Sequence, residues 1–153
     1  MRPLLEPLAG RGYSVLGVRL PGHGFPSGPE PIARGAWEET VDRALDDLRS
    51  RFQRERIAIC GLSMGALLAL GAASRRPTDV GALVLLSPAI QLPAAASRLL
   101  AAARWLVPFA AYRIPKGVSD IRDATARQSH PGCDPFPVSA FVAFDQLRRS
   151  TPA

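Results

Sequence analysis

The sequence is poor in the residue types that build disulfide frameworks and metal sites. Its 153 residues include two cysteines, Cys60 and Cys133, and two histidines. Two thiols provide neither a set of paired disulfides nor a clustered metal signature. Cys60 lies in an apolar run, where a cysteine is usually a small buried hydrophobic residue. The composition therefore predicts a reduced chain without a resident metal.

Lysine is nearly absent. Lys116 is the only lysine, and the rest of the 19 basic residues are arginines. Against 13 acidic residues this leaves a formal net charge of +6. Such an excess can indicate a nucleic-acid or membrane partner. The arginines are scattered, however, and their one tight group, in residues 49–56, accompanies no recognised nucleic-acid motif. We therefore expect no nucleic-acid partner.

The sequence also lacks a hydrophobic leader. An acid at position 6 and prolines at positions 3 and 7 are unlike a signal peptide, which predicts a cytoplasmic protein. One uncharged apolar run, residues 57–73, reaches the lower limit of a membrane span. Three glycines and Ser63 within this run favour a buried strand followed by a buried helix over a membrane-associated segment.

The hydrophobic pattern predicts alternating strands and helices. Strands are expected at residues 13–18, 56–60 and 80–86, each an apolar run typical of strands covered on both faces. Helices are expected before Gly10, between the first two strands, and from about residue 64 to residue 75. The middle helix has one apolar face, formed by Trp37, Val41, Leu45, Leu48 and Phe52. This order predicts βαβ crossovers and a parallel sheet.

The composition changes after residue 89. Residues 89–112 are rich in alanine and predict a helical segment, residues 113–137 are polar with several prolines, and residues 140–149 resume a helical pattern. We therefore expect an α/β core segment in residues 1–89 and a helical cap segment in residues 90–153.

The clearest chemical signal is Gly61-Leu62-Ser63-Met64-Gly65, which matches G-x-S-x-G. Chance gives such a match in about one chain of this length in twelve or thirteen, so its context decides its meaning. A strand predicted to end at Cys60 and a helix predicted to begin at Met64 supply the context of a nucleophile elbow. There a strained turn exposes the serine, and small flanking residues make room for it. We expect Ser63 to be a nucleophile and the Met64 N–H an oxyanion donor. Alternatively, Ser63 only caps the helix.

Several motifs, in this order along the chain, resemble those of the α/β-hydrolase superfamily. They are Gly12-Tyr13, Arg19-Leu20-Pro21-Gly22-His23-Gly24, the Trp37 helix, the G-x-S-x-G motif and Leu83-Val84-Leu85-Leu86-Ser87-Pro88-Ala89. The branch that the chain resembles contains carboxylesterases, monoacylglycerol-lipase-like enzymes and the serine aminopeptidase group. The resemblance implies a three-layer α/β fold with a parallel sheet. It also implies hydrolysis of carboxylic esters by a Ser-His-Asp triad, without a cofactor.

The resemblance covers only part of the family's fold. Family members have eight strands, and this chain supplies equivalents of the fourth, fifth and sixth. The third strand with its oxyanion loop has no counterpart, nor do the acid and histidine that follow the seventh and eighth strands. We therefore expect the middle portion of a hydrolase, inactive in isolation. Because the third strand lies between the fourth and the fifth, its absence should leave exposed sheet edges that are prone to association.

The residues present offer no evident substitute for the missing general base. The resemblance gives His23 a structural role in its Pro-Gly-His-Gly loop, and His130 lies in the cap beside Pro131. Four aspartates of the cap are expected to be solvated: Asp120, Asp123, Asp134 and Asp145. Three apolar cap residues are candidates for lining an acyl pocket or for packing in the core: Leu100, Trp105 and Phe109.

The leading hypothesis is thus a serine hydrolase that cleaves a small acyl ester. One alternative is an inactive fragment that acts as an interaction module, completed by another chain or associating with itself through its sheet edges. The other alternative is a membrane-associated protein.

Overall fold

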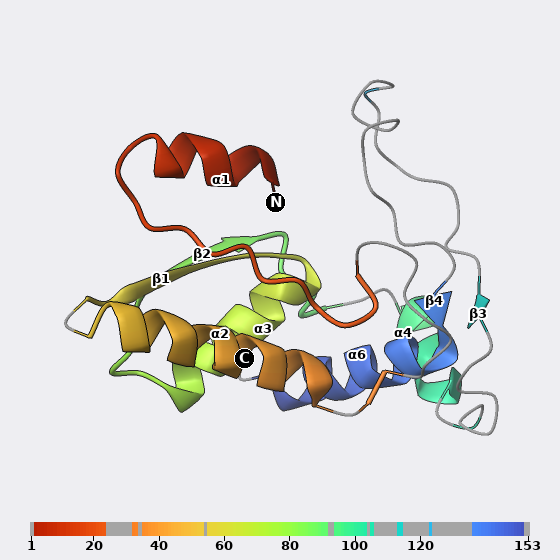
Figure 1. Ribbon diagram of the computed structural model, residues 1–153. Helices are drawn as coiled ribbons and strands as arrows, with labels where there is room; N and C mark the ends of the chain where they lie inside the picture. Colours follow the sequence, from red (N-terminus) through yellow and green to blue (C-terminus); the bar gives the residue numbers. More distant parts are fainter. Residues whose placement is uncertain are drawn as a thin grey trace.

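A computed structural model of the chain describes residues 2–23, 32–33, 35–53, 55–91, 94–103, 105, 113–114, 123 and 136–151. The elements follow one another as α1 (Arg2–Ala9), α2 (Ala36–Arg51), β1 (Ile57–Leu62), α3 (Met64–Arg75), β2 (Val80–Leu86), α4 (Ala94–Ala103), β3 (Arg113–Ile114), β4 (Phe136–Pro137) and α6 (Val138–Ser150). Figure 1 shows α2, α3 and α6 on one side of the β1–β2 pair and α1 on the other.

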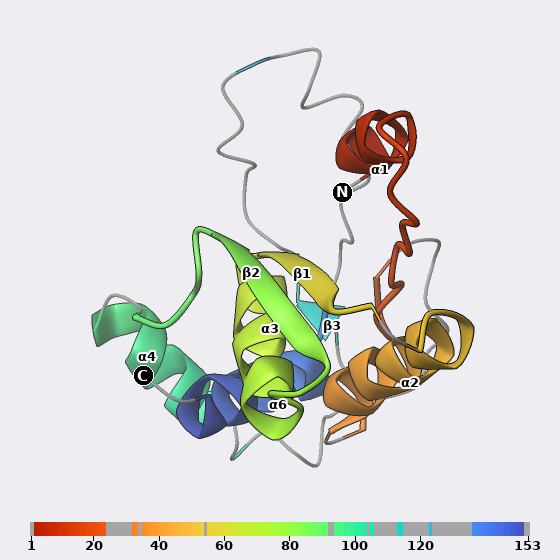
Figure 2. The same ribbon diagram turned by 90° about the vertical axis from the view of Figure 1, so that its left-hand side faces the viewer.

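Strands β1 and β2 form the parallel pair that the apolar runs predicted. Their register runs from Ile57 opposite Val80 to Leu62 opposite Leu86, with an irregularity just after Ile57. Helix α3 connects the two strands and packs against both, and α2 packs against α3. Figure 2 shows this arrangement from the end of the sheet. Parallel strands joined by a helix are the βαβ unit expected from the sequence.

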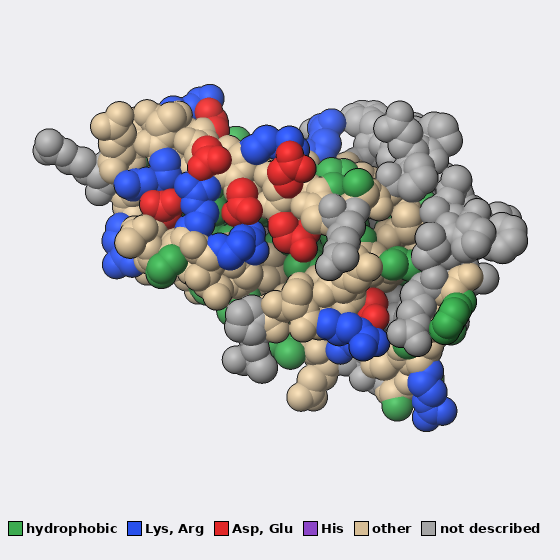
Figure 3. Space-filling model, turned by 90° about the horizontal axis from the view of Figure 1, so that it is seen from below, with side chains coloured by type: hydrophobic (Ala, Val, Ile, Leu, Met, Phe, Trp, Pro, Cys, Tyr) green, Lys and Arg blue, Asp and Glu red, His purple; other side chains and the backbone are tan. Residues whose placement is uncertain are grey.

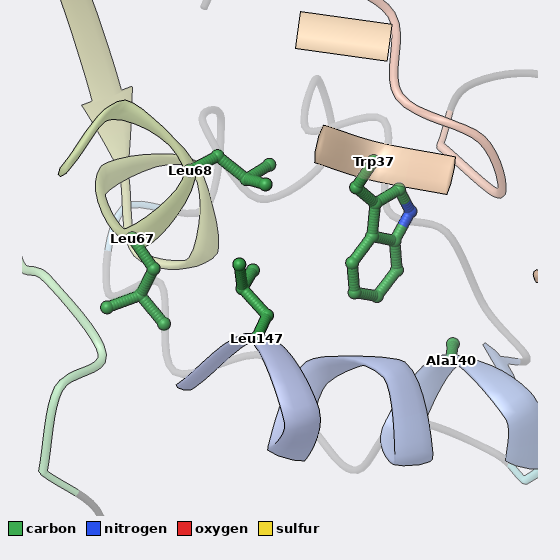
Figure 4. Close-up of a cluster of buried hydrophobic side chains, with 5 residues drawn as sticks. All are labelled: Trp37, Leu67, Leu68, Ala140 and Leu147. Atoms are coloured by element: carbon green, nitrogen blue, oxygen red, sulfur yellow. The ribbon is translucent and has the colours of Figure 1, made fainter. Parts of the chain in front are cut away.

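The main hydrophobic core lies between α2, α3 and α6. Figure 4 shows Leu67 and Leu68 of α3 facing Trp37 of α2 and Leu147 and Ala140 of α6. All five side chains are at most 4% exposed. Small residues of α3 are buried as well and allow neighbouring elements to approach closely: Ala66, Ala69 and Ala72. Helix α6, which belongs to the predicted cap segment, therefore contributes to the same core as α2 and α3.

One face of the β1–β2 pair is exposed and apolar. Three cross-strand pairs form it: Ala58 with Ala82, Cys60 with Val84 and Leu62 with Leu86. Leu62 and Val84 are 51% and 50% exposed. Successive residues of a strand point to opposite faces, and α3 covers only the other face. The expectation of strands covered on both faces therefore holds for one face, and the expectation that Cys60 is buried is wrong.

Residues 13–18 do not form the predicted strand. They make no ladder with a described strand, and Tyr13 and Val18 are 65% and 42% exposed. β propensity alone does not form a strand, because the backbone groups need a neighbouring strand with which to pair. Among the described residues, β1 pairs only with β2. The parallel sheet therefore has two strands, where the sequence predicted three.

The uncharged run of residues 57–73 is divided into β1, a turn at Ser63 and most of α3. Within the part of the chain that the structure describes, no helix has both the length and the apolar character needed to cross a membrane.

Asp145 is not solvated, contrary to the expectation for the cap aspartates. It is 9% exposed and accepts hydrogen bonds from Arg148 Nη2 at 2.9 Å and from Arg149 Nε at 2.7 Å. Burial alone would raise the pKa of this carboxyl, but the two arginine hydrogen bonds and charges outweigh it and lower the pKa below its usual value. Asp123 is exposed, while Asp120 and Asp134 lie outside the described residues.

The arginines near α2 and α3 are largely paired with acidic residues. Figure 3 shows basic and acidic side chains interspersed over the underside of the molecule. The ion pairs are Arg43–Glu39, Arg51–Asp47, Arg49–Asp79, Arg75–Asp42, Arg76–Asp46 and Arg76–Asp79. The first two are the i,i+4 pairs of the α2 surface. This face is therefore a mixed-charge surface and not a basic stripe.

Candidate active site

Ser63 occupies the turn between β1 and α3. Its φ of 53° and ψ of −113° lie in a region that L-amino acids rarely adopt, and its side chain is exposed. The side chain makes no capping hydrogen bond to α3. A strained, exposed serine between a parallel strand and a helix is the geometry expected of a nucleophile elbow. The capping alternative has no hydrogen bond to support it.

Gly61 is required by the close approach of β1 to the start of α3. A Cβ atom added to Gly61 would lie 2.6 Å from the Ala66 nitrogen and closer still to the Gly65 carbonyl group. A Cβ atom added to Gly65 would instead meet no heavy atom within 4 Å. The sequence predicted that both glycines provide clearance. In the described structure the crowding is at Gly61, against the backbone of Gly65.

Backbone groups fix the turn on both sides of Ser63. The Ser63 N–H donates to the Leu86 carbonyl oxygen at 2.8 Å, and the Ala66 N–H donates to the Ser63 carbonyl oxygen at 3.0 Å. Met64 is the first residue of α3, so its N–H is one of the groups that have no partner within the helix. Its side chain packs against the hydrophobic core. The Met64 N–H therefore lies at the positive end of the α3 dipole, beside Ser63.

A second strained serine lies next to this turn, and the sequence reasoning did not single it out. Ser87 directly follows β2, has a φ of 43° and is exposed. Because Leu62 pairs with Leu86, Ser63 and Ser87 are the next residues on neighbouring strands. The signal in the sequence was a serine followed by Pro88 at the carboxyl end of a buried strand.

His23 has contacts of a structural kind, as the resemblance implied. Its Nδ1 lies 3.2 Å from the Pro21 carbonyl oxygen, and the same oxygen accepts a 2.9 Å hydrogen bond from Trp37 Nε1. The imidazole and indole rings meet edge to face with their centres 6.1 Å apart. These contacts attach the residue 20–23 loop to α2.

The same loop lines a shallow hollow of about 390 Å³, formed with α2 by Arg19, Leu20, Pro21, Gly22, His23, Thr40 and Arg43. Ser63 is not among its lining residues. The described residues contain no cluster of three or more histidine, cysteine, aspartate or glutamate side chains arranged to hold a metal ion.

The predicted pocket residues of the cap are only partly described. Trp105 is 75% exposed, and Leu100 lies in α4 without a described side chain. Phe109, His130 and Cys133 lie outside the described residues.

Comparison with known proteins gives a consistent result. Residues 1–131 match the family described as serine aminopeptidase, S33. A thermostable monoacylglycerol lipase of Bacillus sp. (strain H-257) is 37% identical over 100 residues, which are 63% of this chain and 38% of that protein. The 2-hydroxy-6-oxononadienedioate/2-hydroxy-6-oxononatrienedioate hydrolase of Cupriavidus pinatubonensis is 37% identical over 83 residues, which are 54% of this chain and 28% of that protein.

The fold has a counterpart in a solved structure. The crystal structure of a monoacylglycerol lipase of Paleococcus ferrophilus aligns with 97% of this chain at a TM-score of 0.72 and 20% sequence identity. The alignment covers 60% of the lipase chain. This chain therefore spans less than two thirds of the length of each of these three proteins.

Proposed function

The chain belongs to the serine aminopeptidase S33 family of α/β-hydrolases, in the branch that includes monoacylglycerol lipases, and on this basis we propose that it is a serine hydrolase of the carboxylesterase and lipase type. Its substrate is a small carboxylic (acyl) ester, and Ser63 is the nucleophile. No cofactor or nucleic-acid partner is part of the proposal, and the proposed location is the cytoplasm.

The strained turn at Ser63 is the observation that supports this proposal most strongly. The Ser63 side chain is exposed and makes no capping hydrogen bond to α3. The strand before it passes very close to the start of α3, and only glycine at position 61 leaves room for this approach. A serine that only capped the helix would need neither this backbone conformation nor the glycine.

The proposed reaction proceeds through an acyl-enzyme. Ser63 Oγ attacks the ester carbonyl carbon while its proton passes to a histidine base, and the Met64 N–H donates a hydrogen bond to the oxyanion that forms. The intermediate collapses, the alcohol leaves with that proton, and the acyl group remains on Ser63. Water then attacks the acyl group, which releases the carboxylic acid and restores the serine.

The histidine base and its acidic partner are proposed to lie outside these 153 residues. His23 packs against Trp37 and the Pro21 carbonyl, and Asp145 is bound by two arginines. Neither residue is in an arrangement that supports the role. A serine without a base is a weak nucleophile, so the 153-residue chain alone is proposed to be inactive.

The acyl group is proposed to lie against apolar cap residues, namely Leu100, Trp105 and Phe109. Trp105, 75% exposed, presents an apolar ring at the surface. A monoacylglycerol is the favoured substrate class, because the Bacillus lipase matches a longer part of this chain than the Cupriavidus hydrolase does.

Ester hydrolysis tests the proposal. A form extended at both ends by its flanking coding sequence should cleave a monoacylglycerol, and Ser63→Ala should reduce kcat by a factor of at least about a thousand. Ser74→Ala, which changes an exposed serine at the far end of α3, should leave the rate unchanged. An extended form whose Ser63→Ala variant retains full activity would remove Ser63 from the mechanism.

A second candidate function is supported by the exposed apolar face of β1 and β2. Six apolar side chains in register form a surface that parallel strands usually keep covered. An inactive chain that associates with a second copy through this face would bury it. In size-exclusion chromatography with light scattering, a monomer at every concentration would exclude this candidate.

A further inference from the structure

Ser63 and Ser87 share an unusual backbone conformation. Their φ angles are 53° and 43°, and no other non-glycine residue that the structure describes has a positive φ. They are the first residues after two paired parallel strands, since Leu62 lies opposite Leu86. Neighbouring strands are about 4.8 Å apart, so the two serines are adjacent at the carboxyl edge of the sheet.

The conformation of Ser87 is unfavourable for two separate reasons. At positive φ the Cβ atom of an L-residue comes too close to a backbone carbonyl oxygen. Ser87 also precedes Pro88, and the proline ring favours an extended backbone at the residue before it. Glycine would adopt the same φ without the steric cost. Strained residues of this kind are concentrated at binding and catalytic sites.

The Ser87 hydroxyl is available for a ligand. Ser87 is exposed, and the described residues offer its side chain no hydrogen-bond partner. A hydroxyl donates one hydrogen bond and can accept two. It lies at the carboxyl edge of parallel strands, where open α/β sheets bind their ligands.

The position of Ser87 is fixed relative to Ser63 by the backbone. The Leu86 carbonyl oxygen accepts a hydrogen bond from the Ser63 N–H at 2.8 Å. This carbonyl belongs to the peptide group that joins Leu86 to Ser87. The backbone therefore holds residues 63 and 87 beside one another at this edge of the sheet.

We infer that Ser87 is a second substrate-contacting residue of this site, whose hydroxyl hydrogen-bonds an oxygen atom of the ester held against Ser63. This inference rests on the proposed function. Serine at position 87 has a strained backbone that glycine would avoid, and in return its hydroxyl makes a contact with the ester that glycine cannot make. Ser87 takes no part in the transfer of the acyl group.

Binding without turnover tests the inference. Isothermal titration calorimetry of the Ser63→Ala chain with a soluble short-chain monoacylglycerol gives the reference affinity. Adding Ser87→Ala should weaken binding about threefold to tenfold, the worth of one neutral hydrogen bond. Adding Ser87→Gly should weaken binding equally while raising the unfolding temperature, because the backbone strain is relieved. Adding Ser74→Ala should change neither quantity.

Each outcome decides the matter. Unchanged affinity in both Ser87 variants, or no binding of the ester to the Ser63→Ala chain, overturns the inference. If Ser87→Gly binds as tightly as the reference while Ser87→Ala does not, the effect is conformational and the hydroxyl contact is again excluded. Loss of affinity in the Ser87 variants, together with undiminished ester hydrolysis when the extended form carries Ser63→Ala, would remove Ser63 as the nucleophile and leave the Ser87 contact in place.

Discussion

The Ser63 N–H donates a 2.8 Å hydrogen bond to the Leu86 carbonyl oxygen, which connects the turn after β1 to the last residue of β2. This bond continues the parallel pairing by one residue beyond Leu62. The conformation of the serine therefore depends on the sheet as well as on the residues of the turn. Changes that move β1 relative to α3 or β2 should alter Ser63 without touching its hydroxyl.

Gly61→Ala should destabilise the chain and distort the turn. The added methyl group would collide with the Gly65 carbonyl and the Ala66 nitrogen, which are backbone atoms that cannot rotate away. Overpacking of this kind costs about 1–3 kcal/mol in the free energy of unfolding. Urea denaturation followed by circular dichroism measures the loss.

Gly65→Ala is the matched control for that change. Its methyl group would meet no heavy atom within 4 Å, and alanine favours the helix over glycine. We expect unchanged stability or a gain of up to about 1 kcal/mol. Equal losses in the two variants would contradict the close approach assigned to Gly61.

Asp145→Asn should destabilise the chain at neutral pH and have little effect in acid. Hydrogen bonds to charged groups contribute about 1.5–3 kcal/mol, and the asparagine cannot pair with both Arg148 and Arg149 as a charged group. The folded pKa of Asp145 is lowered, so its contribution is complete above the unfolded value of about 3.9 and disappears as the pH falls through the folded value.

Unfolding curves at several pH values test this prediction. The difference in the free energy of unfolding between wild type and Asp145→Asn should begin to shrink as the pH falls below about 4 and should be smallest below the folded pKa of Asp145. Asp47→Asn removes an exposed i,i+4 pair with Arg51 and should cost no more than about 0.5 kcal/mol. A difference between wild type and Asp145→Asn that stays constant with pH would show that the ionised carboxylate is not responsible.

Trp37→Phe should lower the free energy of unfolding by about 1–3 kcal/mol. The indole is 2% exposed and its Nε1 donates to the Pro21 carbonyl oxygen at 2.9 Å, so phenylalanine loses the donor and leaves space in the core. Trp105→Phe, at a position that is 75% exposed, should have little effect on stability. Acrylamide should quench the fluorescence of Trp105 more strongly than that of Trp37.

The Cys60 thiol should react with Ellman's reagent in the native chain at a rate close to that in the unfolded chain. Its side chain lies on the exposed face of β1. A Cys133→Ser background restricts the reaction to this thiol. Slow modification that becomes faster on dilution would show that a second copy covers the apolar face, as the second candidate function requires.

The elements that the sequence predicted well depend on local signals. The apolar runs of β1 and β2, the Gly61–Gly65 motif between strand and helix, and the arginines and Pro77 that end α3 act within a few residues of one another. Periodicity of 3.6 likewise placed Trp37 and Leu45 on the buried face of α2. Such patterns can be read without knowing which distant elements are neighbours.

The predictions that were wrong depended on distant neighbours. Residues 13–18 have the composition of a strand, but pairing requires a partner elsewhere in the chain. In β1, both faces are apolar, so alternation could not show that Cys60 lies on the uncovered one. Asp145 is buried because α6 packs against α3 and α4. The sequence did contain one clue to its pairing, namely arginines three and four residues later.

Covalent labelling of Ser63 tests the central claim most directly. The extended form should react with a fluorophosphonate probe, and mass spectrometry of its peptides should place one adduct on Ser63. Ser63→Ala should remove the label and Ser74→Ala should retain it. A label on any other residue, or an extended and folded form that stays unlabelled, would contradict the assignment of Ser63 as the nucleophile.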